Sequence, residues 1–183
     1  TTQCKWDSVI PFEPMWERID KLVKSNGCIA LFGSEPFSSQ LRCSNIKNYK
    51  YDWYMRKTKP QGFPNAKKMP LKDIETISIF YKNLPIYNPQ GLIKIDKKIK
   101  NSNSKINNKT HISGQNGGSM KIENYTQEYT NYPRQIIEVS PVYNAVHPTQ
   151  KPVELLEYLI KTYTNENETV LDFRMGSGST GVA

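Results

Sequence analysis

Cysteine is scarce in this chain, and the arrangements that give it a special role are missing. The three cysteines, Cys4, Cys28 and Cys43, have spacings that match no zinc site, and no Cys-x-x-Cys pair occurs. Cys28 lies in an apolar run, where its simplest role is that of a small core residue. We therefore expect no metal site, and a reducing cytoplasm as the compartment.

Long apolar runs are absent as well. No stretch of the 183 residues approaches the length of a membrane span, so we expect no membrane partner. Positive charge is abundant by contrast, because 25 Lys and Arg against 17 Asp and Glu give a net charge of +8. This balance favours a polyanionic partner, and the length suits one domain.

The apolar pattern predicts an α/β protein. Helical spacing covers residues 14–26, 37–46 and 153–163, and short apolar runs predict strands at residues 28–32, 51–55, 74–81 and 169–173. A basic loop, residues 56–68, lies between two of these strands. Residues 94–118 are a low-complexity stretch that we expect to be mobile, with order resuming at residues 134–139.

A glycine-rich turn follows the last predicted strand. Gly176, Gly178 and Gly181 have the spacing Gly-x-Gly-x-x-Gly, which lets the backbone approach a ligand and favours a carboxylate or a phosphate. No lysine follows the second glycine, which argues against a P-loop. A dinucleotide site needs an acidic residue about 20 positions later, and Ala183 comes before that point. The spacing alone leaves the ligand open.

Two motifs together carry a family resemblance. The sequence His-Pro-Thr-Gln-Lys-Pro at residues 147–152, followed by a predicted helix and by Leu-Asp-Phe-Arg-Met-Gly-Ser-Gly-Ser-Thr at residues 171–180, resembles the N-4/N-6 amino-group DNA methyltransferases. It is similar to their permuted, beta-type branch, in which the cofactor loop follows the target-recognition segment. Shorter stretches at residues 5–7, 65–70 and 79–82 resemble phage-type members.

This resemblance implies a doubly wound, Rossmann-like α/β fold that uses S-adenosylmethionine, with a target-recognition segment inserted at residues 84–143. The methyl group would go to an exocyclic amine of a DNA base, with adenine N6 favoured over cytosine N4. The residues that the resemblance places at the cofactor are His147, Thr149, Lys151, Asp172, Phe173, Gly176, Gly178 and Ser179.

The resemblance also implies double-stranded DNA as the substrate, and a restriction endonuclease as a candidate partner in a bacterial or phage-infected cell. Lysines would contact phosphates and give an affinity that falls steeply with salt. The predicted DNA contacts are Lys57, Lys59, Lys67, Lys68, Lys94, Lys97 and Lys98.

The chain departs from the family pattern in two places. Arg174 stands where most members have Phe or a small residue, and no Asp-Pro-Pro-Tyr type catalytic tetrapeptide occurs. In relatives this tetrapeptide directly precedes a segment like residues 1–6. We therefore expect a piece of a longer protein, truncated at both ends, and we name no catalytic residue.

The same comparison predicts low stability and no activity for the chain alone. The family's missing strand would lie between residues 28–32 and 169–173, two apolar strands expected to be central. Two alternatives stay open: an NAD-type dinucleotide-binding enzyme, and a catalytically dead DNA-binding remnant.

Overall fold

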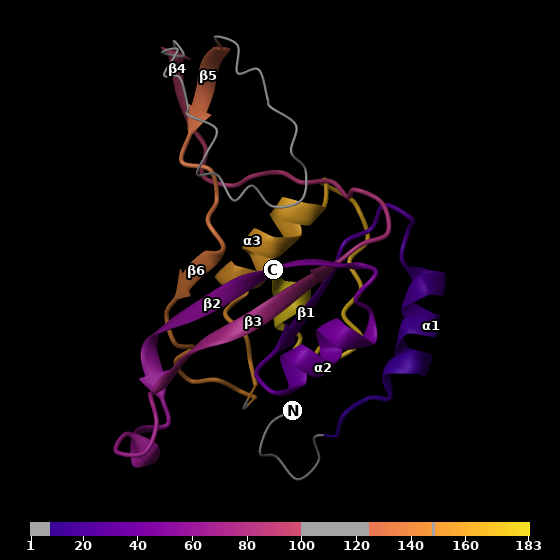
Figure 1. The fold of residues 1–183 in the computed structure, drawn as a ribbon, viewed down its shortest axis with the longest axis vertical. Helices are drawn as coiled ribbons and strands as arrows, with labels where there is room; N and C mark the ends of the chain where they lie inside the picture. Colours follow the sequence, from indigo (N-terminus) through magenta and orange to yellow (C-terminus); the bar gives the residue numbers. More distant parts are fainter. Residues whose placement is uncertain (1–7, 100–124, 148) are drawn as a thin grey trace, which may run out of the picture. The chain divides into compact units, whose positions relative to one another are not determined.

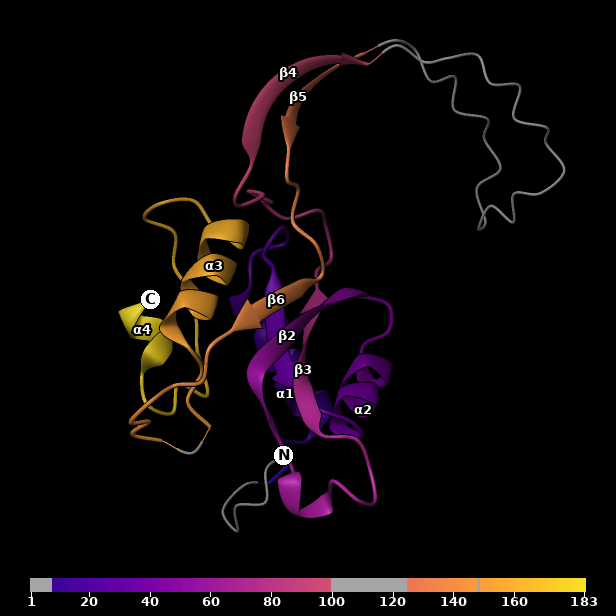
Figure 2. The same ribbon diagram turned by 90° about the vertical axis from the view of Figure 1, so that its left-hand side faces the viewer.

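The structure, a computed structural model, describes residues 8–99, 125–147 and 149–183. Its contacts divide the chain into two units (Figures 1 and 2). The first unit comprises Thr1–Gln90 and Arg134–Ala183, and the second comprises Gly91–Pro133.

The first unit is built on a mixed sheet of β1 (Ile29–Gly33), β2 (Tyr49–Gln61), β3 (Lys72–Phe80) and β6 (Ile136–Val139). The strand order is β1-β3-β2-β6, with β3 antiparallel to β1 and β2, and β2 parallel to β6. Therefore β1, β2 and β6 run in one direction, and their carboxyl ends meet at one edge of the sheet. Open α/β sheets bind ligands at the carboxyl ends of their strands.

Helices pack on both faces of this sheet, which confirms the expected doubly wound α/β architecture. They are α1 (Phe12–Leu22) and α2 (Phe37–Ser44) on one face and α3 (Val153–Tyr163) on the other, while the short α4 (Ser179–Val182) contacts α3. Neighbouring strand residues point to opposite faces, so Ile79 packs with α3 while Phe80 packs with α1 and α2. The buried residues on the α1 and α2 side are Met15, Trp16, Ile19, Leu41 and Phe80.

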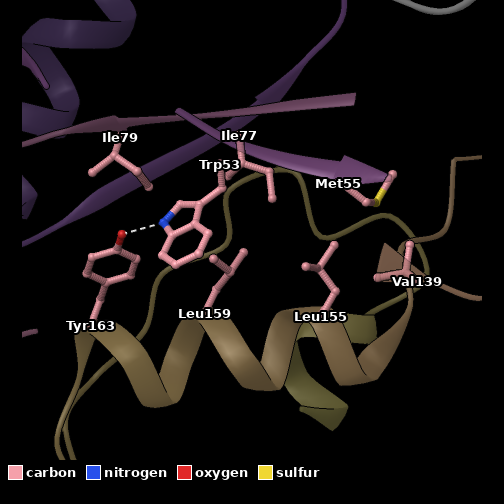
Figure 3. Packing of buried hydrophobic residues seen from close by; sticks show 8 residues of the cluster. All are labelled: Trp53, Met55, Ile77, Ile79, Val139, Leu155, Leu159 and Tyr163. Atoms are coloured by element: carbon pink, nitrogen blue, oxygen red, sulfur yellow. Dashed lines mark hydrogen bonds between the residues drawn. The ribbon is translucent and has the colours of Figure 1, made fainter. Parts of the chain in front are cut away.

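The cluster under α3 forms the larger core (Figure 3). Leu155 and Leu159 point from the helix toward Trp53 and the β3 isoleucines, and the Trp53 Nε1–H donates to the Tyr163 hydroxyl at 2.6 Å. The helix has the bounds that its apolar period predicts. Cys28 packs against the same cluster, and burial raises the pKa of its thiol to about 12, which fits an unreactive core residue.

The prediction of a basic loop at residues 56–68 is wrong for its first half. Residues 56–61 continue β2, because Arg56 pairs with Ile74 and Glu138, and Gln61 pairs with Lys72. Pairing with β3, and with β6 as far as Lys57, outweighs the low strand propensity of Lys and Pro. The connection to β3 is therefore limited to residues 62–71, which we call the β2–β3 turn.

The expectation of a mobile stretch beginning at residue 94 is wrong for its first residues, which form a strand in the second unit. Ile93–Ile99 is strand β4, paired antiparallel with β5 (Tyr125–Thr130), a strand that the sequence analysis did not predict. Lys-rich sequence forms this strand because pairing across the hairpin satisfies its backbone groups. Residues 100–118 of the predicted low-complexity stretch lie outside the described residues, as do Cys4 and residues 5–7.

The strand predicted at residues 169–173 is also wrong. This segment has no ladder partner in the described part of the chain, and Leu171 and Phe173 are exposed. β1 is not central either, since among described strands it pairs with β3 alone. An apolar run becomes a strand when a neighbour accepts its N–H and C=O groups, and the described sheet has no strand between residues 28–32 and 169–173. Across the described ranges, no helix has the length and apolar character of a bilayer span.

Candidate functional site

The glycine-rich turn leads from residue 172 into α4, and its backbone requires glycine at two positions. Gly176 has φ +51° and Gly178 has φ +76°, both in the left-handed region that side chains disfavour. The Gly178 N–H donates to the Met175 carbonyl at 2.7 Å, which closes the turn. Neither glycine carries a side chain of its own, and a Cβ added to Gly178 would lie 3.6 Å from the Met175 methyl.

Asp172 holds this turn together. Its Oδ1 accepts the Arg174 backbone N–H at 2.9 Å, and its Oδ2 accepts the Thr180 hydroxyl at 2.5 Å. Both carboxylate oxygens are therefore engaged inside the turn, and the residue acts by shaping the loop. Arg174 is exposed, so its guanidinium avoids the cost of burial beside the turn.

The His-Pro-Thr-Gln-Lys-Pro motif of residues 147–152 lies against the glycine-rich turn. A Cβ added to Gly176 would stand 3.7 Å from His147 Nδ1, so the imidazole forms a wall beside the glycine. The same Nδ1 is 3.0 Å from the Thr149 hydroxyl and accepts the Thr149 backbone N–H at 3.2 Å. The fold thus brings His147 and Thr149 to the glycine turn, although 29 positions separate His147 from Gly176 along the chain (176 − 147).

The sheet fixes the far end of this motif. The Lys151 ammonium lies 2.5 Å from Glu75 of β3 and 5.2 Å from the centre of the Phe32 ring of β1. Glu75 also pairs with Lys57 of β2 at 2.5 Å, so one carboxylate joins two lysines assigned to different roles. Glu75 was not predicted. Its signal was the one charged side chain within the strand predicted at residues 74–81, which sequence alone did not connect to Lys151.

Opposing effects set the ionisation of Glu75. Burial is the largest influence and would raise its pKa, but the charges and hydrogen bonds of Lys151 and Lys57 together outweigh burial. The pKa of Glu75 is therefore below its ordinary value of 4.5. Glu75 stays an anion at neutral pH, and both lysines keep a partner.

We expect Glu75→Gln to lower the free energy of unfolding by about 2 kcal/mol at neutral pH, since two largely buried ammonium groups lose their counter-ion. The folded-state pKa is depressed, so the stabilisation is complete above the ordinary value of 4.5 and is lost as pH falls through the folded value. Urea unfolding over a pH series should therefore show the two proteins converging in acid.

Glu138→Gln is the matched control, because Glu138 pairs with Arg56 at 3.6 Å between exposed side chains. Surface pairs of this kind contribute little. Equal stability of the two glutamine variants at neutral pH would contradict the role given to Glu75.

The predicted DNA lysines fall into two groups. Lys57 and Lys59 lie on β2, and Lys67 and Lys68 lie in the β2–β3 turn; all except Lys57 are exposed. Lys94 and Lys97 are exposed on β4 of the second unit, while the side chain of Lys98 lies outside what the structure describes. Among the described residues, no three His, Cys, Asp or Glu side chains cluster as metal ligands would.

Comparison with known proteins gives one family. The DNA methylase family model matches residues 4–183. The Type II methyltransferase M2.LlaDCHI of Lactococcus lactis subsp. cremoris is 56% identical over 36 residues, which are 20% of this chain and 13% of that protein. The protein named Putative methylase YubD, from Escherichia coli (strain K12), is 55% identical over 40 residues, which are 22% of this chain and 18% of that protein.

Two solved structures share the fold. The crystal structure of the M1.HpyAVI-SAM complex superposes with a TM-score of 0.59 at 24% identity, over 93% of this chain and 68% of that one. The crystal structure of M1.HpyAVI gives a TM-score of 0.55 at 22% identity, over 90% of this chain and 64% of that one. This chain therefore spans about two thirds of the length of these proteins.

Proposed function

This chain belongs to the DNA methylase family of N6/N4 methyltransferases, and from that premise we propose that it contains the cofactor and DNA sites of a site-specific DNA methyltransferase. The proposed reaction transfers a methyl group from S-adenosylmethionine to an exocyclic amine of a DNA base, with adenine N6 preferred to cytosine N4. The observation that carries the proposal is the packing of His147 on Gly176, which joins the two motif segments. The fold shared with M1.HpyAVI, whose structure is a complex with SAM, supports the same cofactor here.

The residues of this site fit that cofactor. When bound, S-adenosylmethionine supplies an activated methyl group, and the protein binds and orients it. Gly176 and Gly178 leave room at the backbone, and Asp172 keeps the turn closed. The hydroxyls of Thr149 and Ser179 are donors of the kind that suits the polar methionine end, and the Lys151 ammonium is held by Glu75.

Exposed lysines of both units supply the DNA contacts in this proposal. A phosphate contact gives no sequence information but fixes the protein on the duplex, and each one adds to the salt dependence of binding. The target base must leave the stack before a methyl group can reach its amine. Mass spectrometry of methylated product DNA distinguishes N6-methyladenine from N4-methylcytosine.

The remaining features of the whole protein are proposals as well. We place the segments in the permuted, phage-like order, with target recognition ahead of the cofactor motifs, and a restriction endonuclease as the partner. No Asp-Pro-Pro-Tyr type tetrapeptide occurs in residues 1–183. These residues alone should therefore bind cofactor and DNA without transferring the methyl group.

Ultraviolet cross-linking tests the proposal without requiring turnover. Irradiation with methyl-labelled S-adenosylmethionine should label the protein, and excess S-adenosylhomocysteine should prevent the labelling. Labelling that S-adenosylhomocysteine leaves unchanged would overturn the cofactor assignment. Transfer of label to DNA would instead support the enzyme class and contradict the inactivity of the isolated residues.

A further inference from the structure

The β2–β3 turn exposes an aromatic side chain on an ordered loop. Phe63 is 78% exposed and Met69 is 58% exposed. The backbone beneath them is tied by successive hydrogen bonds, from Asn65 N–H to the Gly62 carbonyl at 2.9 Å and from Met69 N–H to the Asn65 carbonyl at 3.0 Å. Phe63 is thus presented to solvent from a defined turn, where burial against the core does not explain it.

The sequence around Phe63 is basic. Residues 57–72 contain five lysines and no acidic residue. Lys57 is neutralised by Glu75, and the exposed ones are Lys59, Lys67, Lys68 and Lys72. The exposed lysines suit the phosphates of a nucleic acid, and the aromatic ring suits the apolar faces of its stacked bases. The turn is therefore complementary to DNA in both charge and polarity.

The turn also lies at the sheet edge that carries the motif loop. It follows the carboxyl end of β2, while Lys151 is held at the same edge through Glu75 and Phe32. Figures 1 and 2 both show the turn projecting beyond the arrowhead of β2, at the end of the sheet where the segment before α3 turns back. DNA bound to the turn would therefore lie at the sheet edge that also holds Lys151.

We propose that Phe63 is a wedge that enters the base stack of the DNA, with the lysines of the turn holding the flanking phosphates. This inference rests on the proposed function and adds a device for exposing the target base. An apolar side chain inserted between base steps unstacks them, and the insertion costs least where pairing is already weak. The wedge therefore makes the protein prefer a mismatched duplex over a matched one.

Fluorescence anisotropy with two short duplexes, identical except for one central mismatch, tests the wedge without knowledge of the recognition sequence. The wild-type chain should bind the mismatched duplex on the order of tenfold more tightly. Phe63→Ala should lose this preference and keep the salt dependence. The Lys67→Ala, Lys68→Ala double variant should keep the preference, while the slope of log affinity against log salt becomes shallower by about 2.

Leu84→Ala is the matched control, since Leu84 is an 80% exposed apolar residue that follows β3, at the opposite end of the sheet. It should behave as wild type. A mismatch preference that survives Phe63→Ala, in a chain that binds DNA, overturns the wedge and leaves the proposed function standing. Absence of salt-dependent DNA binding by the wild type overturns both. If Phe63→Ala weakens binding to a protein partner and leaves DNA binding unchanged, the turn belongs to a protein interface and the wedge is refuted.

Discussion

Asp172→Ala is expected to weaken binding of S-adenosylhomocysteine roughly a hundredfold. The substitution removes two hydrogen bonds that hold the turn in shape, and each hydrogen bond to a carboxylate stabilises a fold by about 1.5–3 kcal/mol before allowance for solvent. The carboxylate ties Arg174 N–H at one end of the turn to the Thr180 hydroxyl at the other. Without it the left-handed glycines lose the frame that fixes their amides. Isothermal titration calorimetry measures the affinity.

Two comparisons separate this effect from general damage. Asp172→Asn keeps one carbonyl acceptor for the Arg174 N–H, so its affinity should fall between those of wild type and the alanine variant. Glu166→Ala removes an exposed carboxylate shortly before the turn and should bind as wild type. An Asp172→Ala protein with unchanged affinity would show that Asp172 does not shape the site.

The second large effect is on stability. Leu155→Ala should lower the free energy of unfolding by about 3 kcal/mol, since a side chain that is 1% exposed leaves a cavity between α3 and the sheet. For a chain of this length that corresponds to a fall in Tm of about 10 °C. Thermal unfolding followed by circular dichroism gives the result.

Leu22→Ala is the matched control for this measurement. Leu22 is also a helical leucine, but it is 68% exposed at the end of α1, so its truncation removes little buried area. Equal losses in the two variants would mean that α3 does not pack on the sheet as described. A loss in Leu155→Ala alone supports the core shown in Figure 3.

The elements that sequence predicted best are those whose pattern is local. The apolar face of residues 153–163 repeats every three to four positions, so both the helix and its buried face could be predicted. The glycine turn was predicted from its spacing, and the left-handed angles of Gly176 and Gly178 explain why glycine stands there. Both features need no information from distant parts of the chain.

The elements that sequence missed depend on distant partners. Residues 169–173 look like a strand, yet strand formation needs a neighbour that the described sheet does not offer. Glu75 meets Lys151 from 76 positions away, and no local pattern reports that pair. The extension of β2 to Gln61 likewise comes from pairing with β3, against the propensity of its own residues.

These contacts form one connected arrangement. Glu75 links Lys57, at the base of the β2–β3 turn, to Lys151, at the end of the motif loop, and His147 of that loop packs on Gly176. The basic turn proposed to face DNA and the glycine-rich turn proposed to bind the cofactor are thereby linked through Glu75. This arrangement is what a methyl transfer between cofactor and DNA base requires of the protein.

The central claim is that the joined motifs bind S-adenosylmethionine, and calorimetric titration of the purified chain with S-adenosylhomocysteine and, separately, with NADH tests it most directly. The account predicts saturable binding of S-adenosylhomocysteine at one site, weakened by Asp172→Ala, and no heat of binding with NADH. Binding of NADH, or absence of S-adenosylhomocysteine binding by a chain that unfolds cooperatively, would contradict it.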